Sequence, residues 1–158
     1  MTIESLVNSC LITHIGGEKF FDAIDEKLRN DNILMTMMIG KVIENEKFDY
    51  IIVSGRFGYA FKDFCSKCID SSFDKSIITI NGGLREGKIN TEIKFDLNNK
   101  DIIFIDDSFY LGRTRDKIKN FIEYKGGKLI CTYVFYDGSR KKDDSVHSFY
   151  RYFDNYDD

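Results

Sequence analysis

The segment Ile102-Ile-Phe-Ile-Asp-Asp-Ser-Phe-Tyr-Leu-Gly-Arg-Thr114 decides the fold that we expect for this chain. Four apolar residues end in two adjacent carboxylates, a short loop with one glycine follows, and a helical pattern begins at Thr114. A buried strand would deliver Asp106 and Asp107 to the C-terminal edge of a sheet, where ligands of open α/β sheets bind. The loop and the helix N-terminus would then offer backbone N–H groups to a phosphate.

The acidic pair has two interpretations. In the structural one, Asp106 and Asp107 are solvated loop residues that cap the helix after a buried strand. In the functional one, their carboxylates accept hydrogen bonds from ribose hydroxyls or lie near a magnesium ion. The position of the pair, after four apolar residues and before a glycine-containing loop, favours the functional interpretation.

The rest of the chain predicts alternating helices and strands. Apolar spacing predicts helices at 18–28, 32–44, 59–69 and 114–124, and strands at 50–54, 76–80, 101–106 and 129–136. A further strand with one wet face is expected at 89–95. This order implies an α/β fold with a mainly parallel sheet flanked by helices on both faces. The aromatic-rich tail at 145–156 is expected to form a short helix on the domain or on a partner subunit.

Composition limits the classes of function. The chain has 158 residues, 42% hydrophobic and 31% charged, which fits one globular domain. Its net charge of −3 argues against broad nucleic-acid binding, which needs a basic face. The N-terminus lacks the features of a signal peptide, and no apolar run approaches the ~20 residues of a membrane span. We therefore expect a cytoplasmic protein with a small-molecule ligand and no membrane or nucleic-acid partner.

The cysteine pattern gives no metal or redox prediction. Cys65 and Cys68 form a C-x-x-C pair, but they lie well inside a predicted helix, and no second close pair supplies the four ligands of a zinc site. The other candidate ligands, Cys131 and His147 among them, are scattered along the sequence. Four cysteines in a chain of this length fit reduced thiols better than a disulfide framework.

The segment from Ile102 to Thr114 resembles the signature of the type I phosphoribosyltransferase family. The resemblance implies binding of phosphoribosyl pyrophosphate with Mg²⁺, transfer of ribose 5-phosphate to a nitrogenous base, and release of pyrophosphate. Asp106 and Asp107 would contact the ribose hydroxyls and are the candidate Mg²⁺ ligands. The candidate residues of the 5′-phosphate loop are Ser108, Tyr110, Leu111, Gly112, Arg113 and Thr114. Two of them depart from the family pattern, which usually has Thr in place of Leu111 and a small residue in place of Arg113.

Two other segments match the family in position. The turn Gly55-Arg56-Phe57-Gly58 follows the first strand, where the family binds pyrophosphate, and would present backbone amides and one guanidinium. Its structural interpretation is a strand-to-helix turn that needs glycine. The loop 81–88 matches a lid that closes over the family's active site, and Arg85 and Lys88 would reach pyrophosphate from it. Its alternative is a solvated hairpin tip.

The resemblance also implies where the base would bind. Tyr136 and Asp137, at the end of the last predicted strand, are the base-site candidates, although Tyr136 fits a core position better. A helical N-terminal hood (1–45) would lie beside the core (46–140). An aromatic tail (141–158) would pack on the same domain or on the partner subunit of a homodimer. The acceptor, purine-type or orotate-type, stays open.

Two rival functions remain. A regulatory protein could bind phosphoribosyl pyrophosphate or a nucleotide on the same fold without catalysis, and the departures at Leu111 and Arg113 favour it. A receiver-like signalling domain also carries an acidic pair at a strand end. In that fold the pair follows the first strand, whereas here it ends a later one.

Overall fold

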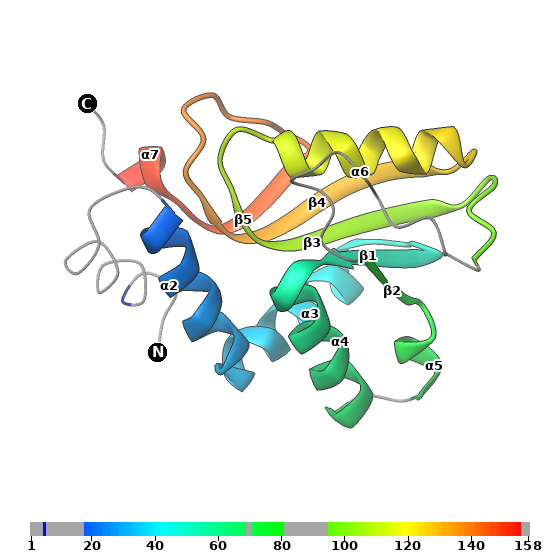
Figure 1. Ribbon diagram of the computed structural model, residues 1–158, viewed down its shortest axis with the longest axis horizontal. Helices are drawn as coiled ribbons and strands as arrows, with labels where there is room; N and C mark the ends of the chain where they lie inside the picture. The colour runs from blue at the N-terminus through cyan, green and yellow to red at the C-terminus, as the bar shows by residue number, and fades with distance from the viewer. Residues whose placement is uncertain (1–4, 6–17, 69–70, 81–94, 156–158) are drawn as a thin grey trace.

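The computed structural model of the chain describes residues 5, 18–68, 71–80 and 95–155. Within them, parallel strands form one five-stranded sheet in the order β2-β1-β3-β4-β5 (Figure 1). The strands are β1 (Tyr50–Ser54), β2 (Ile77–Ile80), β3 (Asp101–Phe109), β4 (Lys128–Asp137) and β5 (Val146–Arg151). The predicted fold class, a mainly parallel sheet flanked by helices, is confirmed.

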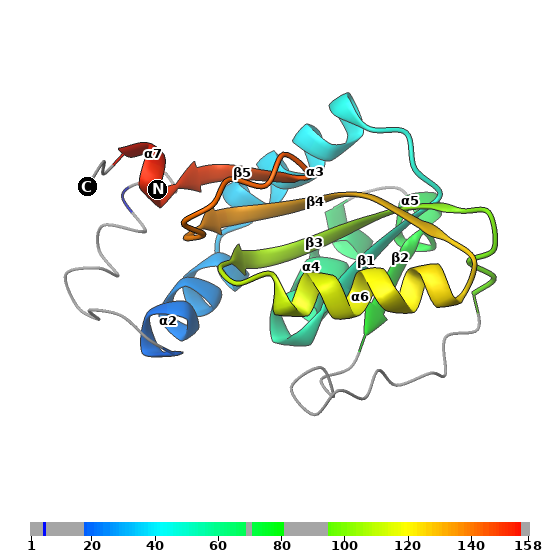
Figure 2. The ribbon, with the colours of Figure 1, turned by 90° about the horizontal axis from the view of Figure 1, so that it is seen from above.

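Helices cover both faces of the sheet. They are α2 (Glu18–Arg29), α3 (Asn32–Asn45), α4 (Gly55–Cys68), α5 (Ser71–Asp74), α6 (Arg113–Tyr124) and α7 (Tyr152–Asn155). Figures 1 and 2 show α6 along one face, over β3 and β4, with α2, α3 and α4 on the other. Two apolar cores follow from this layering. Phe61 and Phe135 are fully buried on the α3–α4 side, and Ile118 and Ile122 of α6 pack on Phe104.

The local sequence explains how the N-terminal helices begin and pack. Asp31 is the N-cap of α3, and its side chain accepts hydrogen bonds from the backbone N–H groups of Ile33 and Leu34. Ile24 and Leu28 of α2 are completely buried in the core on this side of the sheet. The predicted division of the chain into hood, core and tail stays a prediction.

The strand order places a topological switch point between β1 and β3. The chain passes from β1 outward to β2, and β3 then returns to the other side of β1. Ligands of open α/β sheets bind at such a switch point, outside the carboxyl ends of the strands. Val53 of β1 pairs with Ile105 of β3, so the segment after β1 emerges beside Asp106. The fold therefore brings two of the predicted binding segments to one edge.

Three boundaries differ from the sequence-based prediction. The acidic pair does not end β3, because pairing with β4 continues as far as Phe109 opposite Asp137. α4 begins at Gly55, directly after β1, and not at residue 59. The tail was predicted as a helix, but residues 146–151 form edge strand β5 on β4, and only 152–155 are helical.

Part of the predicted architecture falls outside the described residues. The loop 81–88, with Arg85 and Lys88, lies there, as does nearly all of the predicted strand at 89–95. In the part of the chain that the structure describes, no helix is long and apolar enough to cross a membrane.

Candidate functional site

A pocket of about 280 Å³ opens at the carboxyl end of β3. The whole segment from Asp106 to Arg115 lines it, together with Phe104 and Val134. All six residues predicted for the phosphate loop therefore surround one space with both acidic residues. Ser108 lies near the end of β3. Its backbone N–H donates to Asp107 Oδ1 at 2.7 Å.

The carboxyls of Asp106 and Asp107 are half-buried and lie close enough to affect each other's pKa. The backbone N–H of Asp107 donates to Asp106 Oδ1 at 2.9 Å, and the two side chains also hydrogen bond to each other. Burial raises the pKa of Asp106 well above its usual value, and the neighbouring charge of Asp107 adds to the rise. Burial also raises the pKa of Asp107, to about 6, against the opposing hydrogen bonds from Asp106 and Ser108. Two carboxylates this close disfavour simultaneous ionisation.

Asp25 is a third carboxyl near this pair, and sequence reasoning missed it. It lies on α2, is 7% exposed, and its charge raises the pKa of both Asp106 and Asp107. Burial raises its own pKa, while the guanidinium of Arg29 opposes the rise through an ion pair at 3.0 Å. Only the packing of α2 against β3 reveals this arrangement, because the two segments are far apart in sequence.

The loop after β3 presents an uncapped helix N-terminus to the pocket. Gly112 is the N-cap residue of α6 with φ of +72°, and no side chain caps the first-turn N–H groups. An added Cβ there would lie 3.2 Å from the Phe109 ring. Both the positive φ and this close contact favour glycine at position 112. The Leu111 side chain is 62% exposed, and Arg113 is exposed in the first turn of α6. An exposed helix N-terminus of this kind suits an anion.

Arg115 is a second residue that the sequence did not single out. Its guanidinium pairs with Asp143 at 2.9 Å, donates to Ser145 Oγ at 3.1 Å, and lies over the Phe109 ring. It therefore ties the start of α6 to the loop between β4 and β5. That loop lines an adjoining pocket of about 730 Å³, which also contains the basic run at 140–142. The run is visible in the sequence, but only the fold places it beside the phosphate loop.

The predicted pyrophosphate segment is the first turn of α4 and not a loop. Gly55 has φ of +64° at the junction with β1, and an added Cβ on Gly58 would lie 2.9 Å from the Val53 carbonyl carbon. The Phe57 side chain is buried in the core, so this residue can offer a ligand only its backbone N–H. Arg56 is exposed, 3.6 Å from Asp22. The segment thus offers a helix N-terminus and one accessible guanidinium.

The predicted base residues lie inside the protein. Tyr136 is 5% exposed and stacks on Tyr150, with ring centroids 6.1 Å apart. Asp137 is 2% exposed; it accepts the Ser139 backbone N–H at 2.8 Å and pairs with Arg151 at 3.4 Å. Neither residue lines the two pockets described above. Both hold the end of β4 and the following turn in place.

Comparisons with known proteins support the fold. No family model and no curated protein matches the sequence. An adenine phosphoribosyltransferase from Thermoanaerobacter pseudethanolicus is similar in structure, with a TM-score of 0.58 at 17% identity over 82% of this chain and 84% of that one. The chain has a type I phosphoribosyltransferase-like fold. A hypoxanthine phosphoribosyltransferase from Staphylococcus aureus gives a TM-score of 0.51 at 18% identity, over 84% of this chain and 77% of that one.

A longer protein also contains a similar unit. The UMP synthase of Leishmania donovani gives a TM-score of 0.52 at 16% identity. The match spans 91% of this chain but 29% of the synthase. At these identities the likeness concerns the fold, and the chemistry has to be argued from the residues of this chain.

Proposed function

We propose that this protein binds phosphoribosyl pyrophosphate and transfers its ribose 5-phosphate to a nitrogenous base, releasing pyrophosphate. One observation carries the proposal: the coupled pair Asp106–Asp107 and the uncapped N-terminus of α6 line a single pocket. Carboxylates accept hydrogen bonds from the ribose 2′- and 3′-hydroxyls, and a helix N-terminus binds the 5′-phosphate. The type I phosphoribosyltransferase-like fold supports this proposal.

The phosphate end of the ligand would lie on the loop after β3. The backbone N–H groups that follow Gly112 supply donors, and the Thr114 hydroxyl and Arg113 guanidinium supply side-chain contacts. Backbone donors do not depend on side-chain identity, so the exposed Leu111 leaves them in place. Arg113 adds a charge-assisted hydrogen bond where the family usually has a small residue.

The acidic pair fits a magnesium ion. Asp106 and Asp107 offer the carboxylate oxygens that Mg²⁺ prefers. A cation bound beside them would favour their ionised forms against the effect of burial, which raises both pKa values. When bound, Mg²⁺ would neutralise charge on the pyrophosphate group. The pair itself holds the ribose hydroxyls and so orients C1 toward the acceptor.

The pyrophosphate end would lie at the start of α4, after the neighbouring strand β1. The first-turn N–H groups at 55–58 and the exposed Arg56 guanidinium are its proposed partners. Arg85 and Lys88, outside the described residues, are proposed to complete this end from the lid. Closure of a lid would keep water from the reaction centre.

The reaction requires little covalent work from the protein. The bond from C1 to the pyrophosphate oxygen breaks with its electron pair leaving on pyrophosphate, and the base nitrogen forms the new bond to C1 and loses a proton. Positive charge develops at C1 in between, and nearby carboxylates stabilise it. We place the base beside the turn after β4, which Asp137 fixes through the Ser139 N–H. The acceptor class, purine-type or orotate-type, is left to experiment.

A second candidate is a protein that binds the same ligand without catalysis. Leu111 favours it, because this exposed apolar side chain replaces a hydroxyl donor in the phosphate loop. Such a protein would bind phosphoribosyl pyrophosphate or a nucleotide and regulate another system. The ligand site would be the same, and only turnover separates the two functions.

Calorimetric titration with phosphoribosyl pyrophosphate, with and without Mg²⁺, tests the proposal. We expect Mg²⁺-dependent binding, and a loss of at least about 100-fold in affinity in the Asp106→Asn, Asp107→Asn double variant. Asp63→Asn, an exposed carboxyl on α4, is the matched control and should bind normally. Pyrophosphate release with a panel of purine bases and orotate then identifies an enzyme, and binding without release identifies the regulatory protein. Absence of binding by the folded protein contradicts both.

A further inference from the structure

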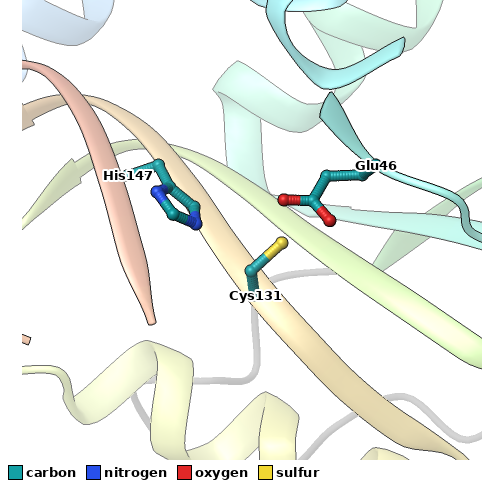
Figure 3. Close-up of side chains that lie close together, drawn as sticks. All are labelled: Glu46, Cys131 and His147. Atoms are coloured by element: carbon teal, nitrogen blue, oxygen red, sulfur yellow. The ribbon is translucent and has the colours of Figure 1, made fainter. Parts of the chain in front are cut away.

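A second cluster of polar side chains lies away from this pocket, toward the amino-terminal end of the sheet. Glu46 follows α3, Cys131 is on β4, and His147 is on edge strand β5 (Figure 3). Cys131 pairs with Ile103, three residues before Asp106, which corresponds to about 10 Å along the strand. Cys131 and His147 are scattered along the sequence, but parallel pairing of β4 with β5 brings them together in the fold.

Their donor atoms converge on one point. The thiol sulfur, one imidazole nitrogen and one carboxylate oxygen all lie within 4.8 Å of one another. In a tetrahedral zinc site, with bonds of roughly 2.0–2.3 Å, neighbouring ligand atoms are about 3.5 Å apart. Side-chain movements of about 1 Å would close this cluster onto an ion. We propose that Glu46, Cys131 and His147 bind one Zn²⁺ ion, with water in the fourth position.

The surroundings hold the carboxylate and the imidazole in place. The backbone N–H of Glu46 caps α3 by donating to the Val42 carbonyl at 3.0 Å. The Tyr133 hydroxyl donates to Glu46 Oε1 at 2.9 Å, and the Tyr133 ring lies against the imidazole of His147, with centroids 4.9 Å apart. Contacts of this kind orient metal ligands and fix their geometry. One residue thus supports two of the three proposed ligands.

The chemistry of the donors selects the ion. A thiolate and an imidazole suit Zn²⁺, whereas Mg²⁺ and Ca²⁺ prefer oxygen ligands alone. Burial and the Glu46 carboxylate raise the pKa of the Cys131 thiol to about 12, so the ion-free protein holds a neutral thiol there. Formation of the Zn–S bond would release that proton to solvent.

The ion would connect three separate elements. β5 has β4 as its one neighbour in the described sheet, and Lys41 of α3 reaches its Ser148 carbonyl at 3.5 Å. A bound ion would join β5 to β4 and to the end of α3 through direct bonds. The ion would hold these elements together, and the site is independent of the function proposed for the pocket at β3.

Cobalt substitution tests this site without any assay of activity. The 158-residue chain, stripped with a chelator under reducing conditions, is titrated with Co²⁺, and a thiolate-to-cobalt charge-transfer band reports the sulfur ligand. We expect saturation at about one ion per chain and loss of the band on adding Zn²⁺. Zinc should also raise the melting temperature and slow amide exchange in β5.

Variants assign the ligands. Cys131→Ser should abolish the charge-transfer band, and His147→Gln and Glu46→Gln should each weaken Zn²⁺ binding at least tenfold. Gln at position 46 keeps an acceptor for Tyr133, and His147 reaches solvent, so these two variants test the site even if Cys131→Ser fails to fold. Cys68→Ser removes an exposed thiol from the end of α4 and should leave the band unchanged. A band that depends on Cys68, or no saturable binding by the wild-type protein, overturns the proposal.

Discussion

At the scale of single residues, Asp107 predicts an unusual dependence of stability on pH. Its pKa is raised from 3.8 to about 6 on folding, mainly by burial, so the folded state holds a proton more tightly than the unfolded state. The contribution of this group to the free energy of unfolding is present below pH about 4. It is lost as the pH rises through about 6.

The Asp107→Asn variant should remove that loss. We expect its free energy of unfolding at pH 7 to exceed that of the wild type by about 1–2 kcal/mol, with the difference vanishing near pH 4. Urea unfolding at a series of pH values measures the free energy of unfolding of the variant and of the wild type. Asp63→Asn, which removes an exposed carboxyl that pairs with Lys67 at 2.7 Å, is the control for the loss of a surface charge. A constant difference between Asp107→Asn and wild type across the pH series would refute the assigned cause.

Two glycines offer a matched test of backbone strain. Gly112→Ala places a Cβ at φ of +72° and within 3.2 Å of the Phe109 ring, so we expect a loss of about 1–3 kcal/mol in stability. Gly40→Ala lies inside α3 with nothing within 4 Å of the added Cβ, and should gain about 0.5–1 kcal/mol. Chemical denaturation compares them. Equal effects of the two substitutions would show that Gly112 carries no special conformation.

At the scale of elements, a buried ion pair joins the ends of β4 and β5. Arg151 Nε lies 3.4 Å from Asp137 Oδ2, with side chains 10% and 3% exposed, and Arg151 Nη2 donates to the Ser139 carbonyl at 2.8 Å. Arg151→Met would leave the Asp137 charge buried without this partner, so we expect a loss of about 3–5 kcal/mol. Asp137→Asn in the same chain should restore part of it. A double-mutant cycle by urea unfolding measures the coupling, and strictly additive losses would argue against the pair.

Sequence patterns predicted those elements whose information is local. Residues 50–54 form β1 as expected, because an apolar run stands between polar flanks and the glycine at 55. The end of β3 was misjudged, since two carboxylates argue against a buried strand, yet pairing with β4 carries it on to Phe109. The aromatic tail at 145–156 is predicted as a helix, whereas residues 146–151 form β5, whose conformation depends on its neighbour β4.

The candidate site divides in the same way. The segment from Asp106 to Thr114 is continuous in sequence, so its convergence on one pocket could be predicted from the order of strand, loop and helix. The roles of Asp25 and Arg115 could not be predicted in this way. Asp25 approaches the pair only through the packing of α2, and Arg115 is held by the loop between β4 and β5. The same limit hid the cluster of Glu46, Cys131 and His147.

At the scale of the whole molecule, the strand order brings two helix N-termini to the same edge of the sheet. α4 begins directly after β1 and α6 begins after β3, and these strands are neighbours in the sheet. If a ligand with phosphates at both ends spans them, as proposed above, each end should respond to its own arginine. Arg56 serves the pyrophosphate end, and Arg113 the 5′-phosphate end.

Fragments of the ligand separate these contributions. We expect Arg56→Ala to weaken pyrophosphate binding about tenfold and to leave ribose 5-phosphate binding unchanged, because one charge-assisted hydrogen bond contributes about 1.5–3 kcal/mol. Arg113→Ala should weaken ribose 5-phosphate binding and leave pyrophosphate binding unchanged. Both variants should weaken the binding of phosphoribosyl pyrophosphate. Calorimetry measures all three ligands, with Lys67→Ala, an exposed cation at the far end of α4, as the control for net charge. If either arginine variant weakened both fragments equally, the two helix starts would not be separate subsites, and the ligand would lie along one of them alone.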